Sequence, residues 1–258
     1  MQLVLSLMPG LDLLGYAFKR EGFCVVQGGD VIWGGDVRTE HYPPGKFDGV
    51  ISGPPCQMFS RLAHMVRHNG YEPKFGNLIP EFERVVIEVQ PTWFVMENVP
   101  DAPLPSVPGY ATWSCILNNR QCFDENGEPA TQNRTRRWTF GDKRTGKRTA
   151  LMIDVAVFEN PKFEYAATGG SQQTRNGHIV AMNRGNKIKR SRMPFNTKSA
   201  AAAQELCRMQ GLPEDFLAHS PFRKDAQCKM LGNGVPLPMG RAIAKAVREA
   251  IAQPQRGE

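Results

Sequence analysis

The stretch LVLSLMPGLDLLGYAFKREGFCVV (residues 3–26) decides the fold class. Its apolar start, Leu3 to Leu5, runs into the tight turn Pro9-Gly10 and predicts a buried strand. An amphipathic helix from about Leu13 to Glu21 and a second strand at Cys24 to Val26 follow. Strand, helix and strand in this order predict the first βαβ unit of a parallel sheet.

The same alternation continues along the chain. We expect a strand at Phe47 to Ser52, a helix at Leu78 to Val89 and a strand at Trp93 to Met96. Two further helices are expected at Ala200 to Met209 and Arg241 to Ile251. The pattern predicts an α/β fold with a doubly wound, mostly parallel, Rossmann-like sheet and helices on both faces. Ligands of such sheets bind beyond the carboxyl ends of the strands.

Charge and composition divide the chain into residues 1–140, an insert at 141–198 and a closing segment at 199–258. The net charge is +7, and residues 141–198 hold twelve Lys and Arg against four Asp and Glu, so the rest sums to about −1. Part of the insert is also rich in Gly, Ser, Thr, Asn and Gln. A polyanion contact and a solvated basic loop both explain this charge.

Composition also excludes several classes of protein. The six cysteines form no C-x-x-C pair and no metal-ligand spacing, which argues against a zinc site and a disulfide scaffold. No apolar stretch reaches the roughly 18 residues of a membrane span. Residues 1–7 are apolar without a basic leader, so we interpret them as a core strand. We expect no metal, no membrane contact and a reducing cytoplasm.

Three motifs carry possible chemistry. The turn GPPCQ (residues 53–57) follows a predicted strand and holds Cys56, WFVMENVP (93–100) holds Glu97, and QNRTRR (132–137) holds alternating arginines. Each alone has an ordinary explanation: a small buried thiol, a solvated strand end and a phosphate-facing basic strand. Their order along the chain is more informative than any one of them.

In this order the motifs resemble the cytosine C5 DNA methyltransferase family of bacteria and phages, which has the S-adenosylmethionine-dependent methyltransferase fold. The resemblance covers most of the chain. Its five motifs are Pro55-Cys56-Gln57, Glu97-Asn98-Val99, the triad Gln132, Arg134 and Arg136, the run from Arg208 to Phe216, and the run from Gly232 to Pro238.

The resemblance implies a covalent mechanism on a cytosine flipped out of its helix. The Cys56 thiolate would add to C6 of the ring, because C5 is too poor a nucleophile unaided. Glu97 would hydrogen-bond the N3 and amino edge, and Arg134 would reach O2. Arg136 would support this geometry.

The resemblance also implies S-adenosylmethionine as cofactor. Its implied contacts are Met8, Pro9, Gly10, Leu11, Asp30, Trp33, Asp36, Pro54 and Asn233. The first loop departs from the family, because Asp12 stands where a second glycine is usual and a helix is missing between Asp30 and Asp36. Trp33 is either an adenine-stacking residue or a core residue.

For the substrate, the resemblance implies double-stranded DNA bound by a monomer. Residues 141–198 stand where the family keeps its target-recognition region, and this short insert predicts a short or relaxed target site. The residues expected to contact DNA or the flipped base are Gln57, Ser60, Asn98, Gln132, Arg175 and Arg184.

Two alternatives stay open at this point. One branch of the fold family methylates transfer RNA with the same catalytic set, and a basic insert does not separate RNA from DNA. A catalytically silent DNA-binding relative is disfavoured, since it would need neither Cys56 nor Glu97. Whether the enzyme belongs to a restriction-modification pair depends on neighbouring genes.

Overall fold

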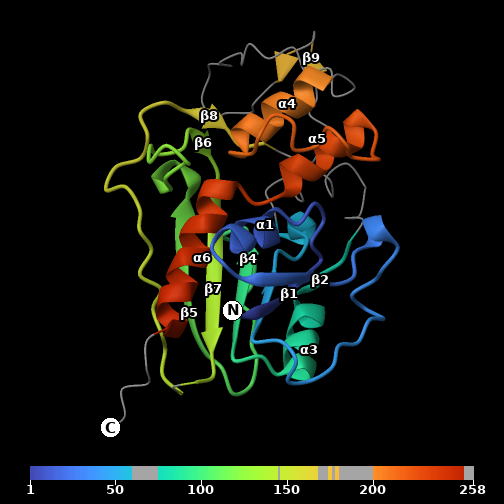
Figure 1. Cartoon of the computed structure of the whole chain (residues 1–258), viewed down its shortest axis with the longest axis vertical. Helices are drawn as coiled ribbons and strands as arrows, with labels where there is room; N and C mark the ends of the chain where they lie inside the picture. Colours follow the sequence, from blue (N-terminus) through green and yellow to red (C-terminus); the bar gives the residue numbers. More distant parts are fainter. Residues whose placement is uncertain (60–74, 145, 168–173, 176–177, 180–199, 253–258) are drawn as a thin grey trace.

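A computed structural model describes residues 1–59, 75–144, 146–167, 174–175, 178–179 and 200–252. Its centre is a six-stranded sheet in the order β2-β1-β3-β4-β7-β5 (Figure 1). The strands are β1 (Leu3–Leu7), β2 (Cys24–Gln27), β3 (Gly49–Ser52), β4 (Trp93–Asn98), β5 (Ala111–Asn118) and β7 (Thr135–Asp142).

The sheet is parallel in one part and antiparallel in the other. Strands β2, β1, β3 and β4 run parallel, whereas β7 pairs antiparallel with both β4 and β5. This confirms the predicted mostly parallel α/β sheet. The antiparallel edge formed by β5 and β7 was not predicted, because no helix separates the two strands to give the βαβ pattern.

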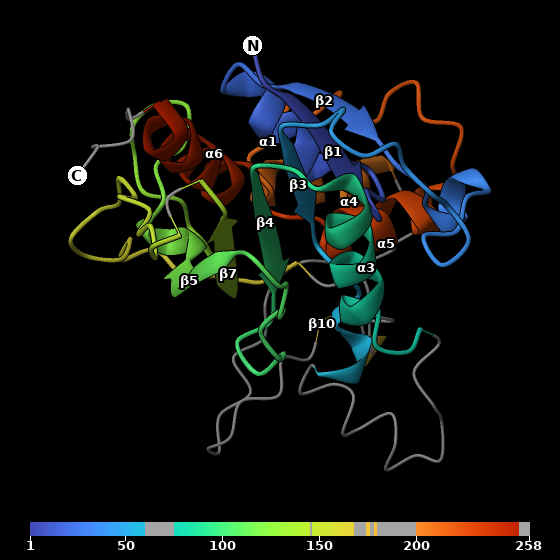
Figure 2. The same cartoon turned by 90° about the horizontal axis from the view of Figure 1, so that it is seen from below.

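Helices cover both faces of the sheet (Figure 2). The described helices are α1 (Leu13–Arg20), α3 (Ile79–Val89), α4 (Ala200–Met209), α5 (Lys224–Asn233) and α6 (Leu237–Ala252). Successive strand residues alternate between the faces: Val4 packs in the cluster with α1 and α6, and Leu5 packs in the cluster with α3. The sheet is therefore buried on both sides, as its continuous apolar strands require.

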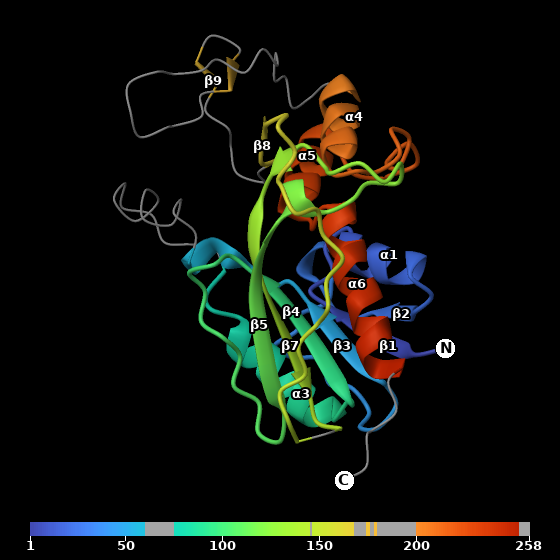
Figure 3. The same cartoon turned by 90° about the vertical axis from the view of Figure 1, so that its left-hand side faces the viewer.

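Helices α4 and α5 lie beyond the carboxyl end of the parallel strands (Figure 3). They bury Leu206 and Leu231 against Leu13 and Ala17 of α1. Shorter elements complete this end and the adjoining loops: η1 (Val31–Trp33), η2 (Cys56–Met58), η3 (Asn119–Gln121), β6 (Gln132–Asn133), β8 (Glu164–Tyr165), β9 (Thr174–Arg175) and β10 (His178–Ile179). No helix in the described ranges is long and apolar enough to cross a membrane.

The predicted insert at 141–198 does not begin as a separate unit. Strand β7 crosses residue 141, and the buried side chain of Leu151 lies in the core beside α6. Asp142 pairs with Trp93, the first residue of β4, so the following basic residues lie at the amino edge of the sheet. Lys143 donates to the carbonyl of Gln90 there (2.5 Å). The first basic residues of the segment 141–198 therefore lie at the opposite edge of the sheet from the carboxyl ends of the parallel strands.

Candidate active site

The thiol of Cys56 lies at the carboxyl edge of the sheet. Strand β3 ends at Ser52, and a rigid Gly-Pro-Pro turn leads into η2, which begins at Cys56. The side chain of Cys56 is half-buried. A Cβ atom on Gly53 would lie 3.1 Å from Oε2 of Glu97, so the turn passes close to that carboxylate.

Glu97 and Arg136 form an ion pair beside this turn. Nε of Arg136 lies 2.7 Å from Oε1 of Glu97, and the side chains are 16% and 10% exposed. The strand register explains the contact: Glu97 is opposite Trp138, and Arg136 lies two residues away on the same face of β7. The guanidinium therefore holds the carboxylate at the end of β4.

Arg134 lies between β6 and β7 and is almost completely buried, at 3% exposed. Its Nη1 donates to the carbonyls of Ala167 (2.7 Å) and Gly232 (3.0 Å), and its Nη2 donates to that of Asn233 (3.4 Å). Its Nε has no hydrogen-bond partner among the described residues. Burial, with the like charge of Arg136, lowers the pKa of Arg134 to about 9, so the group stays charged at neutral pH.

Both burial and charged neighbours act on the pKa of the Cys56 thiol. Burial raises the pKa of the Cys56 thiol, and the Glu97 carboxylate raises it further. Arg136 and Arg134 oppose this and lower that pKa, since a cation stabilises the thiolate. The structure thus brings together all four residues that the sequence assigned to catalysis.

Three polar residues assigned to the substrate bond to the protein itself. Asn98 donates to the carbonyl of Pro54 (3.3 Å), which ties the end of β4 to the Cys56 turn. The wholly buried Gln132 donates to the carbonyl of Met209 (2.5 Å). The side chain of Gln57 accepts a hydrogen bond from a backbone N–H (3.3 Å). In this structure, these three side chains hold segments of the site together.

The structure does not describe the side chains of the other residues predicted to contact the substrate. Ser60 and Arg184 lie outside the described residues. Arg175 belongs to β9, which pairs with β10, and its side chain is likewise not described. Their contacts with DNA stay predictions.

The turn after β1 has an unusual backbone. Met8, Gly10 and Asp12 all have positive φ, at 51°, 58° and 55°. This left-handed conformation favours glycine, which explains why glycine is usual at position 12 in the resembling family. The Asp12 carboxylate offsets the cost, because it caps α1 by accepting from the N–H of Gly15 (3.1 Å). It also accepts from the hydroxyl of Ser6 on β1 (2.7 Å).

The side chains of Asp30 and Trp33 both form hydrogen bonds with the backbone of this turn. Oδ2 of Asp30 accepts from the N–H of Gly10 (2.9 Å), and Nε1 of Trp33 donates to the carbonyl of the same residue (2.9 Å). Trp33 is 52% exposed, so it is not a core residue. A Cβ on Gly10 would meet nothing within 4 Å, so space is open beside the turn. The exposed indole of Trp33, the carboxylate of Asp30 and the space beside Gly10 together could accommodate the base and ribose of an adenosine group.

The other implied cofactor residues are placed less directly. Asp36 forms a forked pair with Arg38, in which Nε lies 2.9 Å from Oδ1 and Nη2 lies 2.5 Å from Oδ2. Hydrogen bonds from Arg38 lower the pKa of Asp36 to about 2. The side chain of Asn233 is exposed. Three residues form part of the loops themselves: Pro9 at the turn, half-buried Leu11 before α1, and buried Pro54 before Cys56.

Glu40 and Tyr42 were missed by the sequence analysis. The carboxylate of Glu40 fills the space where a Cβ on Gly29 or Gly35 would lie. It accepts from the Tyr42 hydroxyl (2.6 Å), which in turn accepts from the N–H of Gly29 (2.9 Å). The two Gly-Gly pairs around Asp30 were the available sequence signal, since paired glycines often mark close approach of another group.

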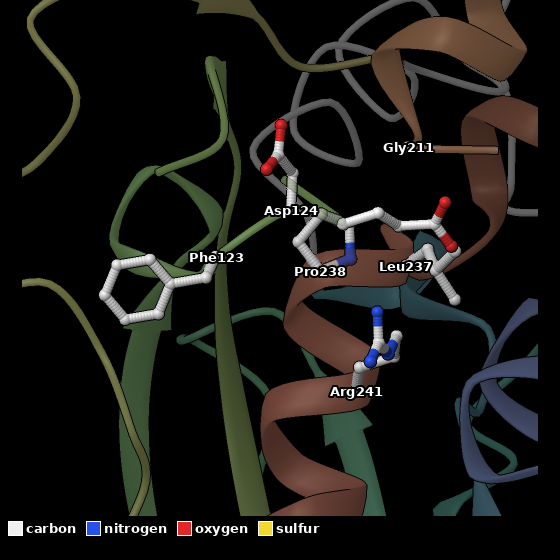
Figure 4. Close-up of a pocket in the computed structure, with 7 residues that line it drawn as sticks. Phe123, Asp124, Gly211, Leu237, Pro238 and Arg241 are labelled. Atoms are coloured by element: carbon white, nitrogen blue, oxygen red, sulfur yellow. The ribbon is translucent and has the colours of Figure 1, made fainter. Parts of the chain in front are cut away.

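A small cleft lies away from these residues, between α6 and the segment after η3 (Figure 4). Its volume of about 10 Å³ has room for a single water, so it is too small for a nucleoside. Its lining is Phe123, Asp124, Glu125, Gly211, Leu237, Pro238 and Arg241. Among the described residues, no three His, Cys, Asp or Glu side chains gather as metal ligands.

Comparisons with known proteins match nearly the whole chain. The Type II methyltransferase M.FnuDI of Fusobacterium nucleatum is 32% identical over 346 aligned positions, covering 98% of this chain and 96% of that protein. The solved Dnmt2 methyltransferase of S. pombe covers 96% of this chain and 99% of its own, with a TM-score of 0.59 and 13% identity. EhMeth of Entamoeba histolytica has a TM-score of 0.60 at 9% identity, covering 98% and 99%. Both solved structures share the fold.

The family itself is identified by the sequence match. A model described as C-5 cytosine-specific DNA methylase matches residues 30–105 and 111–249. These ranges include both Cys56 and Glu97, together with Arg134 and Arg136. The chain therefore belongs to the family of C-5 cytosine-specific DNA methylases.

Proposed function

We propose that Cys56 is the nucleophile of this DNA cytosine-5 methyltransferase. The observation that carries the proposal is the position of a half-buried thiol at the end of β3, within the fields of Glu97, Arg134 and Arg136. Its sulfur bonds to C6 of cytosine, which makes C5 electron-rich enough to accept a methyl group. The C5 proton then leaves and elimination frees Cys56.

The charged neighbours stabilise the ring during this attack. Glu97 hydrogen-bonds the N3 and amino edge of the cytosine and holds the pyrimidine in place for the attack. Arg134 reaches O2 of the ring, and its Nε, which has no hydrogen-bond partner in the described part of the chain, donates to that oxygen. Arg136 keeps the Glu97 carboxyl aimed at the base through their 2.7 Å contact.

S-adenosylmethionine supplies the methyl group as an electrophilic sulfonium. The turn from Met8 to Leu11 receives the amino-acid part of the cofactor, and Asp30 accepts hydrogen bonds from the ribose hydroxyls. The open face of Trp33 stacks on the adenine. Asp36 accepts from the adenine amine while it shares its oxygens with Arg38. Pro54 and the Asn233 loop line the approach to Cys56.

The substrate is a cytosine flipped out of double-stranded DNA. Target recognition falls to the part of the insert from about residue 166 to 198, since the earlier part packs on the sheet. Arg175 and Arg184 contact phosphates or bases in this region. One copy of the chain carries the full catalytic set, so we infer a working monomer.

Transfer of labelled methyl from S-adenosylmethionine tests the proposal. The wild-type chain methylates duplex DNA, and Cys56→Ser lowers the rate at least about 1,000-fold, because serine is a far weaker nucleophile than a thiolate. DNA affinity, measured by fluorescence anisotropy, stays within about twofold of wild type.

The matched control is Cys24→Ser, which removes an exposed thiol on β2 and leaves the rate unchanged. An unchanged rate in Cys56→Ser would end the proposed mechanism. Methylation of transfer RNA without methylation of DNA would contradict the substrate. Bisulfite sequencing of DNA from expressing cells gives the modified base and its sequence context.

A further inference from the structure

The indole of Trp33 is supported by an aromatic ring from the far end of the sequence. The rings of Trp33 and Phe222 lie 5.0 Å apart with an interplanar angle of 65°, an edge-to-face contact. On its other side, the indole N–H is fixed to the carbonyl of Gly10. The half of Trp33 that stays exposed is therefore held in one orientation by two partners.

The segment around Trp33 is held by individual contacts between side chains and backbone groups. Every residue from 28 to 48 is described, and the helical content between β2 and β3 is the single turn η1. Asp30 and Trp33 anchor η1 to the two polar groups of the Gly10 backbone. Because individual contacts hold this segment, the contact between Trp33 and Phe222 matters for the position of the indole.

The backbone of Phe222 is fixed by a contact with α5. Its carbonyl accepts a hydrogen bond from the side chain of Gln227 (2.8 Å), which is buried in α5. At the other end of α5, the carbonyls of Gly232 and Asn233 accept from the buried guanidinium of Arg134. The backbone of Phe222 is thus bonded to a helix that begins two residues later and is tied at both ends.

We infer that Phe222 is a positioning residue for the cofactor: it orients Trp33 so that the open indole face receives an adenine ring. The inference rests on the proposed function, since it concerns the same adenosine site. Phe222 acts through Trp33 and takes no part in methyl transfer. Its loss weakens adenosine binding and leaves the chemical step intact once the cofactor is saturating.

Calorimetric binding of S-adenosylhomocysteine tests this role without requiring turnover. Phe222→Ala raises the Kd about 10-fold, equivalent to about 1.4 kcal/mol, whereas Phe222→Tyr stays within about twofold of wild type. The kcat of Phe222→Ala at saturating cofactor also stays within about twofold. Phe222→Leu keeps the apolar volume and gives the same test if the alanine variant does not fold.

The matched control is Phe163→Ala. Phe163 is an aromatic residue that is 49% exposed and contacts Arg120, whose guanidinium lies 5.3 Å from the ring centre. This variant keeps the wild-type Kd. A double-mutant cycle adds a second check. The double variant Trp33→Leu, Phe222→Ala binds S-adenosylhomocysteine no more weakly than Trp33→Leu alone, because each change removes the same contact between the two rings.

Two results would overturn the inference. A wild-type Kd in Phe222→Ala would show that Trp33 needs no such support, and equal weakening in Phe163→Ala would show a general effect of losing an aromatic ring. Failure of the wild-type chain to bind S-adenosylhomocysteine would overturn the proposed cofactor as well, which separates the two failures.

Discussion

The carboxyl edge of the sheet holds two regions that are built differently. In the catalytic region, Glu97 lies in β4 and Arg136 in β7, and Cys56 follows β3 by a rigid turn. In the cofactor loop, which comprises the turn at residues 8–12 and the segment 28–42, individual bonds to Gly10 hold Asp30 and Trp33 in place. Strand pairing fixes the first region and separate contacts fix the second.

The difference indicates which region tolerates shortening. Moving a strand residue shifts a whole register, whereas a loop bond contributes about 1 kcal/mol and can be replaced by another. The alignment with M.FnuDI has 346 positions against the 258 residues of this chain, so the relative carries insertions. This chain has Glu97 and Arg136 on paired strands, and its cofactor loop is held by Asp30, Trp33 and Glu40.

The largest expected effect comes from adding one methyl group to β3, the strand that leads to Cys56, and one to the cofactor loop. A Cβ on Gly49 would overlap the fully buried ring of Trp93, and neither β3 nor the ring has room to move. Gly49→Ala therefore lowers the free energy of unfolding by about 3 kcal/mol. Gly10→Ala meets open space and costs about 1 kcal/mol for its positive φ. Urea unfolding of both variants checks the contrast, and equal losses would contradict it.

Much of the fold was predictable from the sequence, because strand burial leaves a recognisable pattern of residues. Buried parallel strands leave continuous apolar runs, so β1, β3 and β4 were expected at nearly their observed places. Strand β5 is half-exposed and lacks such a run, and the sequence analysis missed it. Helix α5 was also missed, because its polar sequence with Lys224, Asp225 and Gln227 has no clear apolar stripe.

Arg136→Gln probes the catalytic region by its charge. Arg136 lowers the pKa of Cys56, so its removal raises that pKa and moves the pH profile of iodoacetamide alkylation to higher pH. Methyl-transfer kcat falls about 100-fold, because Glu97 loses the group that aims it. A profile that stays in place or moves to lower pH would show that the arginine does not act on the thiol.

Asp36→Asn gives the smallest expected effect and probes the cofactor loop. Both carboxylate oxygens already accept from the exposed Arg38, so the gain from a further hydrogen bond to adenine is small. We expect unchanged thermal stability and a rise of about threefold in the Kd for S-adenosylhomocysteine. A rise above about 30-fold would mean that Asp36 leaves Arg38 and binds the cofactor as a main contact.

The reactive groups of the candidate site were predictable from the sequence. The residues that hold neighbouring loops in position were much less so. Motif order alone predicted Cys56, Glu97, Arg134 and Arg136 as catalytic residues, and the four lie close enough for their charges to act on the thiol. Glu40 and Phe222 could not be found this way, because each acts through a contact between segments with no shared motif. Such tertiary contacts depend on how loops fold back, which local sequence patterns do not encode.

The most direct measurement is trapping of the chain on duplex DNA that contains 5-fluorocytosine. Fluorine replaces the proton that must leave C5, so elimination is blocked and a covalent intermediate persists. With S-adenosylmethionine present, we predict a denaturant-resistant complex whose cross-linked peptide, identified by mass spectrometry, carries the base on Cys56. Methylation of ordinary cytosine without any trapped complex, or a cross-link at another cysteine, would contradict a nucleophile at position 56.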